Sequence, residues 1–395
     1  MVTTTYSIDP RYRATAGSGY EGVVRVSFGG YYGTGSLLYD GRAILTAAHL
    51  FAGKSGTATV QFETSSGIQT FTTAQIAVHP GYDANSNNDL AIVWLDTAPP
   101  LPAERYTLYR DSDEIGHNFT FSGYGMTGTG NSGAIDGNPI RLQASNRFDA
   151  EGATLTHYLG AGMSWTPLPG SQLIADFDNG SHSNDALGQL TGRYDTGLGL
   201  DEGMIAPGDS GGPAFIAGKI AGVASYIASL GGSNSPDIDA QTNSSFGEIG
   251  AWQRVSAQQQ WIDQTLRQHY PNPPTTPNEV EKWVPEGDGG THYAYFLLQF
   301  IGVRADPEQI LSVDYATRDG TALAGRDYLA VSDTLRLYPD ENQAVIPVEV
   351  IGDETPEPDE IFYLDVFNPV GGSFGAGVLT LTAARTIVDD DGWLG

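Results

Sequence analysis

The 395-residue sequence contains no cysteine, which excludes a disulfide framework and any thiolate metal site. It also lacks any run close to the roughly 18 consecutive apolar residues that a membrane helix needs. The opening segment "MVTTTYSIDP" has no apolar stretch flanked by basic residues, so no signal peptide is visible. These absences do not identify a cellular compartment.

Basic residues are scarce, with 19 Lys and Arg against 47 Asp and Glu, and the net charge is −28. Neutralisation of phosphates requires Lys and Arg, so this balance argues against nucleic acid and anionic membranes as partners. It suits a soluble protein that binds cations.

The sequence predicts many short strands. Segments such as "VVRVSF", "LAIVWL" and "IAGVASY" have strand length and are rich in β-branched or aromatic residues, and clusters of Gly, Ser, Asn and Asp separate them. The one clear helix is predicted at residues 256–268, with Ser256 as its N-cap. The polar segment "HYPNPPTTPNE", with its prolines, follows this helix and is typical of a linker. We therefore expect an all-β fold with one helix before this proline-rich segment.

The composition changes after this segment, because residues 275–395 hold 22 of the 47 acids but only 6 of the 19 bases. Alternating strands recur there, and "LSVDYA" places Leu311, Val313 and Tyr315 on one face. We predict a first domain at 1–270, with a core at about 20–268, a linker at 271–279 and an all-β domain at 280–395.

The stretch "APGDSGGPAF" embeds Ser210 in glycines. A serine hydroxyl is a poor nucleophile until a base takes its proton. Of seven histidines, His49 stands out because it follows the apolar segment "AILTAA". Asp89 precedes the apolar strand in "NNDLAIVWL", where it could orient a histidine or simply cap a turn.

Together, "LTAAH", "NNDLAIVWL" and "GDSGGP" resemble the three signatures of the trypsin/chymotrypsin-like serine peptidase family, in that family's chain order. The resemblance covers about residues 20–270 and implies a chymotrypsin-like double β-barrel with a C-terminal helix. It implies that His49 is the general base and that Asp89 orients it. Ser210 would be the nucleophile, and the backbone N–H groups of Gly208 and Ser210 would form the oxyanion hole.

Alignment to the family assigns a primary substrate pocket to Met204, Ser225, Ile227 and Gly250. Met204 stands where trypsin-type members carry an aspartate, so we expect a small or medium apolar P1 residue rather than Lys or Arg. The alternative is that loop insertions at 228–249 displace these positions. Asp209 matches the carboxylate that in many members pairs with an amine freed by zymogen cleavage, and the usual "IVGG"-like terminus is missing.

The segments "VDYATRDGTALAGRDY", "VIGDETPEPDEIFYLDVFNP" and "TIVDDD" resemble the Calx-β domain, a calcium-binding Ig-like β-sandwich. Calcium takes six to eight oxygen ligands, which clustered carboxylates supply. The resemblance implies the ligands Glu286, Asp327, Asp353, Glu354, Glu357, Asp389, Asp390 and Asp391. Gly352 stands where richer members place another acid, and the alternative is a solvated acidic end without an ion.

The leading hypothesis is a secreted, monomeric serine endopeptidase acting on protein or peptide substrates, with calcium as the only expected cofactor and none needed for the chemistry. Any signal peptide would be absent from this sequence. The rival is a catalytically silent adhesin or matrix-binding protein that uses a protease fold and a calcium-stabilised sandwich.

Overall fold

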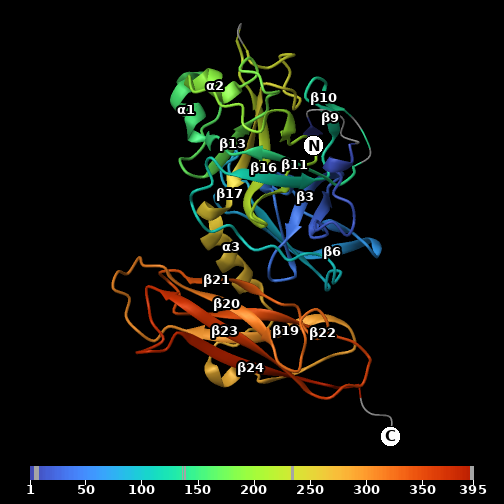
Figure 1. The fold of residues 1–395 in the computed structure, drawn as a ribbon, viewed down its shortest axis with the longest axis vertical. Helices are drawn as coiled ribbons and strands as arrows, with labels where there is room; N and C mark the ends of the chain where they lie inside the picture. Colours follow the sequence, from blue (N-terminus) through green and yellow to red (C-terminus); the bar gives the residue numbers. More distant parts are fainter. Residues whose placement is uncertain (4–8, 136, 138, 233–234, 392–395) are drawn as a thin grey trace. The chain divides into compact units, whose positions relative to one another are not determined.

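The computed structural model describes residues 1–3, 9–135, 137, 139–232 and 235–391. The chain divides into two compact units. The first unit comprises Met1–Leu38 and Arg42–Ile262, and the second comprises Tyr39–Gly41 and Asp263–Gly395. Figure 1 shows that strands dominate both units.

Six strands of the first unit form a closed barrel in the order β2-β3-β4-β7-β6-β5. Alternate residues of β2 are buried, as expected for strands with one face on a core. The barrel is filled by apolar side chains that include Val24, Ile44 and Phe62. The strand bounds are β2 Val23–Phe28, β3 Tyr31–Leu37, β4 Ala43–Thr46, β5 Thr59–Thr64, β6 Gly67–Val78 and β7 Ala91–Leu95.

A seven-stranded sheet, in the order β11-β8-β15-β16-β17-β13-β12, builds the other half of the first unit. Its strands are β8 Asn118–Gly123, β11 Leu142–Arg147, β12 Ala150–Glu151, β13 Gln172–Asp176, β15 Pro213–Ile216, β16 Lys219–Ser229 and β17 Glu248–Arg254. A small sheet, β10-β9-β1-β14, joins β1 Val2–Thr3, β9 Thr127–Thr129, β10 Gly133–Ile135 and β14 Gly203–Met204. The barrel and the large sheet agree with the predicted double-barrel architecture.

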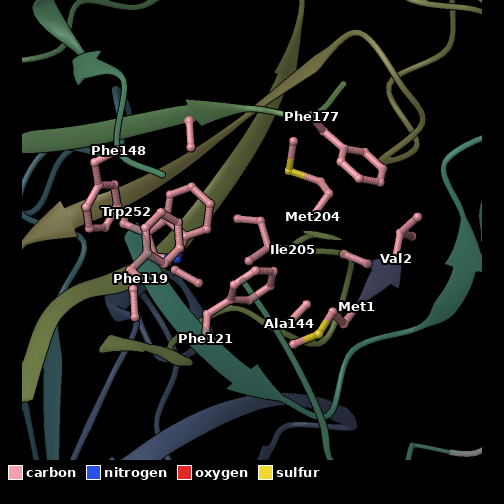
Figure 2. Close-up of a cluster of buried hydrophobic side chains, with 14 of the residues drawn as sticks. Met1, Val2, Phe119, Phe121, Ala144, Phe148, Phe177, Met204, Ile205 and Trp252 are labelled. Atoms are coloured by element: carbon pink, nitrogen blue, oxygen red, sulfur yellow. The ribbon is translucent and has the colours of Figure 1, made fainter. Parts of the chain in front are cut away.

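One aromatic cluster forms the core of this second half (Figure 2). Phe119 and Phe148 stack with ring centroids 3.9 Å apart, and Trp252 meets Phe119 edge-on at 5.0 Å. Met204 and Ile205 belong to the same cluster. The loop that carries Ser210 is therefore anchored in the core a few residues upstream.

Helices are few. α3, Val255–His269, confirms the predicted helix, but Ser256 lies inside it rather than at its N-cap, and its hydroxyl donates to Glu114 Oε1 at 2.5 Å. Two short helices, α1 Ala153–Leu159 and α2 Ala186–Thr191, were not predicted. The 3₁₀ turns are η1 Pro10–Tyr12, η2 Ala48–Leu50, η3 Gly160–Gly162, η4 Gly199–Asp201 and η5 Pro277–Glu279.

The second unit is a β-sandwich, as predicted. One sheet has the order β18-β24-β23-β20-β21 and the other pairs β19 with β22. The predicted inward face of Leu311, Val313 and Tyr315 is buried. The bounds are β18 Trp283–Pro285, β19 Gly290–Gln299, β20 Leu311–Asp319, β21 Ser332–Leu337, β22 Gln343–Gly352, β23 Glu360–Val370 and β24 Thr380–Val388.

Gly250, in β17, is required by close packing against Trp252 and against Met204 of β14. A Cβ atom at this position would lie 2.8 Å from Met204 Sδ and 2.8 Å from the Trp252 ring. Contacts this short force neighbouring groups to shift, and overpacking of this kind costs about 1–3 kcal/mol.

We predict that Gly250→Ala lowers the free energy of unfolding by about 1–3 kcal/mol, measured by denaturant unfolding of the whole chain. The matched control is Gly162→Ala, because a Cβ atom there has no heavy atom within 4 Å. An equal effect of the two substitutions would contradict the packing argument.

Candidate active site and acidic clusters

The loops that carry His49 and Asp89 bring the two side chains into contact. His49 lies in η2, directly after β4, and Asp89 lies directly before β7, which pairs with β4. His49 Nδ1 is 2.7 Å from Asp89 Oδ2, and the backbone N–H of His49 donates to Asp89 Oδ1 at 2.8 Å. The Asp89 side chain is fully buried, while that of His49 is 34% exposed. The carboxylate therefore fixes the ring while the other edge of the imidazole can meet a reactant.

Ser225, in β16, is a third partner of Asp89. Its hydroxyl donates to Asp89 Oδ2 at 2.6 Å. Sequence alignment assigned Ser225 to the substrate pocket, and the side chain also lines the cavity beside Ser210. Asp89 thus accepts three hydrogen bonds, which offset the cost of burying its carboxylate.

Ser210 lies in the loop between β14 and β15. Its backbone carbonyl accepts from Thr34 N at 2.8 Å, and the Gly208 carbonyl accepts from the Thr34 hydroxyl at 2.9 Å. These bonds tie the loop to β3 of the closed barrel. The structure records no hydrogen bond between Ser210 Oγ and His49 within the residues that it describes. In ligand-free enzymes such bonds often tighten only when substrate binds.

The backbone around Ser210 presents two unused donors. The N–H groups of Asp209, Gly211 and Gly212 donate to Ala206 O, Ala224 O and Asp209 O, each at 2.8 Å. In contrast, the described part of the chain offers no acceptor to the N–H of Gly208 or Ser210. Gly208 has φ of +96°, and a Cβ there would lie 2.7 Å from the Tyr32 ring. Glycine is therefore needed at this position, and the two free N–H groups have the pattern of an oxyanion hole.

Asp209 is buried and forms an ion pair with the N-terminal ammonium. The N-terminal ammonium of Met1 lies 2.8 Å from Asp209 Oδ2, and Asp209 also accepts from Gly125 N at 2.8 Å and Ala206 N at 2.9 Å. Burial lowers the pKa of the ammonium, and the Asp209 carboxylate opposes that shift.

A cavity of about 340 Å³ lies beside Ser210. Its lining is mostly apolar and comprises Ile205, Ala206, Pro207, Ser210, Ser225, Tyr226 and Ile227. Of the four residues that the alignment assigned to the substrate pocket, Ser225 and Ile227 line this cavity. Met204 is fully buried in the core and is not part of this lining, and Gly250 packs against the Met204 sulfur. Sequence reasoning missed Ile205, Ala206, Pro207 and Tyr226.

Five of the eight predicted calcium ligands fall into two groups in the second unit, and Asp353, Glu354 and Asp390 belong to neither. Carboxylate oxygens of Glu286, Asp389 and Asp391 lie within 4.8 Å of one another, as do those of Asp327, Glu357 and Glu360. Glu360 was not among the ligands that the resemblance implies, and it is the first residue of β23. Asp390 accepts from Gly287 N at 2.9 Å, and Asp353 accepts from Thr355 N at 2.6 Å.

The first group fits a cation better than the second. Asp389 Oδ1 and Asp391 Oδ2 are buried and have no hydrogen-bond partner among the described residues. In the second group, Arg326 already forms an ion pair with Glu357 and lies 3.7 Å from Asp327. Gly352 admits no side chain, because a Cβ there would lie 2.2 Å from Gly287 O. The acid that richer Calx-β members place at this position has no room here.

Burial, together with the negative charges of Asp353, Glu357, Asp389 and Asp391, raises the pKa of Glu286 to about 7. A carboxyl group whose pKa is raised in the folded state stabilises the fold below its unfolded pKa of about 4.5. That contribution is lost as the pH rises toward 7, when the group must ionise among like charges.

We therefore predict that, in metal-free buffer, Glu286→Gln stabilises the chain more at pH 7.5 than at pH 5. Thermal unfolding of both proteins at the two pH values measures this difference. The control is Asp306→Asn, an acid outside both groups. A Glu286→Gln effect that does not change with pH would contradict the assigned charge crowding.

Comparison with known proteins agrees with both resemblances. Residues 11–156 match the Trypsin family and residues 299–391 match the Calx-beta domain family. The first match includes His49 and Asp89 and ends before Ser210.

Sodium/calcium exchangers are among the curated proteins that are similar to this chain. The sodium/calcium exchanger Calx of Drosophila melanogaster is 39% identical over 88 residues, which is 22% of this chain and 9% of the exchanger. Human sodium/calcium exchanger 2 is 38% identical over 92 residues, 20% of this chain and 10% of the exchanger. The chain thus spans about a tenth of the length of these relatives. None of the described helices is long and apolar enough to cross a membrane. The chain therefore combines a trypsin-like domain with a Calx-beta domain.

Proposed function

We propose that the chain is a serine endopeptidase that uses His49, Asp89 and Ser210. The observation that carries this proposal is the 2.7 Å contact between His49 Nδ1 and the fully buried Asp89. The unused N–H groups of Gly208 and Ser210 support it, because an acyl-transfer site needs donors where negative charge develops.

The proposed reaction proceeds through an acyl-enzyme. Ser210 Oγ attacks the peptide carbonyl carbon while its proton passes to His49 Nε2, and the carbonyl oxygen becomes an oxyanion facing Gly208 and Ser210 N–H. The C–N bond then breaks as His49 returns the proton to the leaving amine. Water, activated by His49, hydrolyses the ester and restores Ser210. Asp89 stabilises the imidazolium throughout.

The substrate class follows from the cavity beside Ser210. Ile205, Ala206 and Ile227 bring aliphatic groups to its wall, and no acidic side chain is part of its lining. A Lys or Arg side chain would lose its hydration there without gaining a counter-ion. We propose a small or medium apolar P1 residue.

We further propose that Glu286, Asp389 and Asp391 hold Ca²⁺ in the second unit. Hard oxygen donors suit this ion, and the buried oxygens of Asp389 and Asp391, which have no partner among the described residues, support binding there. The ion would neutralise the crowded carboxylates and thereby stabilise the fold; it plays no part in the peptidase chemistry. We also propose that the chain is secreted. Extracellular modules bind Ca²⁺ with dissociation constants of about 10⁻⁴–10⁻³ M, and a site made of a few carboxylates is compatible with this range.

Ser210→Ala is expected to reduce casein hydrolysis by about 10⁴-fold or more, because the acyl-enzyme can no longer form. Ser183→Ala serves as the control, since this exposed serine lies outside the site. Equal rates for the wild type and Ser210→Ala would reject the triad and favour the non-catalytic binding protein.

The P1 preference is testable with chromogenic peptides that carry Ala, Leu, Phe, Arg or Glu at P1. We expect the highest kcat/KM with Ala or Leu and the lowest with Arg and Glu, because the cavity wall is aliphatic. Fastest cleavage after Arg would overturn the proposed pocket without affecting the triad.

Calcium addition is expected to raise the melting temperature of the whole chain, by linkage between binding and folding. Asp389→Asn should reduce this shift, and Asp306→Asn should leave it unchanged. Identical melting temperatures in calcium and in chelator would contradict the site.

A further inference from the structure

We infer that Gln253 is a positioning residue that orients the Ser225 hydroxyl toward Asp89 and holds the loop that carries Asp89. This inference rests on the proposed peptidase function and adds to the triad a residue outside the three motifs. Its basis is a chain of hydrogen bonds that runs from β17 to Asp89.

Gln253 lies in β17 and is fully buried. Its side-chain amide nitrogen donates to the backbone carbonyl of Ser86 at 2.8 Å and to the Ser225 hydroxyl at 3.3 Å. The Ser86 carbonyl can only accept, so the group facing it must be the NH₂ end of the amide. Gln253 Oε1 has no partner among the described residues, so the amide is held by its nitrogen.

The two donors of the amide act on Asp89 by two routes. A hydroxyl that accepts a hydrogen bond from the amide must aim its own proton elsewhere, and the neighbouring acceptor is Asp89 Oδ2, 2.6 Å from Ser225 Oγ. That same oxygen faces His49 Nδ1 at 2.7 Å. The Gln253 amide thus fixes the direction of a bond to the carboxylate oxygen that binds the catalytic ring.

The second route is through the loop before Asp89. Ser86 has φ of 57° and Asn88 has φ of 51°, in the left-handed region that residues other than glycine seldom adopt. A backbone of this kind persists only where its surroundings hold it. Gln253 and Gln172 both donate to Ser86 O, and Gln258 donates to Asn88 Oδ1 at 2.7 Å. The seven-stranded sheet and α3 therefore hold the loop that delivers Asp89 to the closed barrel.

Gln172 provides a matched comparison. It is also fully buried, and its amide donates to the same Ser86 carbonyl at 3.0 Å. Its side-chain oxygen accepts from the Tyr226 hydroxyl at 2.8 Å, and no bond to Ser225 is recorded for its side chain. Gln253→Met and Gln172→Met therefore both remove a bond to the strained loop, and only Gln253→Met removes the bond to Ser225.

The experiment measures kcat/KM against pH for the wild type, Gln253→Met, Gln172→Met, Ser225→Ala and the double variant Gln253→Met/Ser225→Ala. In Gln253→Met, the Ser225 hydroxyl is free to rotate, and Asp89 can lose it as a donor. Asp89 then interacts more strongly with the protonated His49 ring than it does in the wild type. We expect Gln253→Met to lower kcat about 10-fold with little change in KM, and to move the acid limb of the profile to higher pH. Gln172→Met should leave the acid limb in place.

The double-mutant cycle separates positioning from a general loss of stability. If Gln253 acts through Ser225, Gln253→Met should not move the acid limb further in the Ser225→Ala background. An unshifted limb in Gln253→Met, or equal shifts in Gln253→Met and Gln172→Met, would overturn the inference. Melting temperatures of the single variants verify that each one folds.

Failure of the peptidase proposal is distinguishable from failure of this inference. If the wild type shows no hydrolysis that depends on Ser210, the peptidase proposal fails. In that case an NMR titration measures the pKa of the His49 ring in the wild type, in Gln253→Met and in Gln172→Met. A change of this pKa in Gln253→Met alone supports the inference independently of activity. Equal pKa values in the two variants overturn it.

Discussion

The site of the first unit depends on one buried negative charge, that of Asp89. A carboxylate removed from water is costly unless donors surround it. Here the donors are the His49 backbone, the His49 ring and the Ser225 hydroxyl. The first two come from the closed barrel and the third from the seven-stranded sheet. Satisfying this charge therefore requires both halves of the unit to be assembled, which couples formation of the site to completion of the fold.

The same coupling explains the unusual backbone before Asp89. Asn87 is buried, and its side chain accepts from Leu168 N at 2.8 Å and donates to Thr166 O at 3.0 Å. Bonds from a distant loop, from β13 and β17 and from α3 converge on these few residues. The loop can hold positive φ values at Ser86 and Asn88 because so many independent contacts fix it.

Sequence patterns predicted the architecture and the parts of the site that are local in the chain. The short β-rich segments, the helix at 256–268 and the sandwich face of Leu311, Val313 and Tyr315 have periodicities that neighbouring residues alone determine. The triad residues were found through resemblance of the surrounding motifs, and their roles stay proposals. Gln172 and Gln253 gave no comparable signal. A polar residue inside "EIGAWQR" has the pattern of an outward position on a strand, and its burial depends on tertiary contacts.

The two acidic groups show a similar division between local and tertiary information. The number of acids near Glu286, Asp353 and Asp389 is a property of the sequence, but which oxygens converge depends on how strand ends meet. Arg326 illustrates the difference, because it neutralises Glu357 and thereby weakens the case for an ion beside Asp327. The first group has no basic residue recorded as an ion-pair partner of Glu286, Asp389 or Asp391 in the described chain. Its charge must be relieved by protonation or by a cation, and above neutral pH, where Glu286 with its pKa of about 7 is mostly ionised, a cation is the more effective of the two.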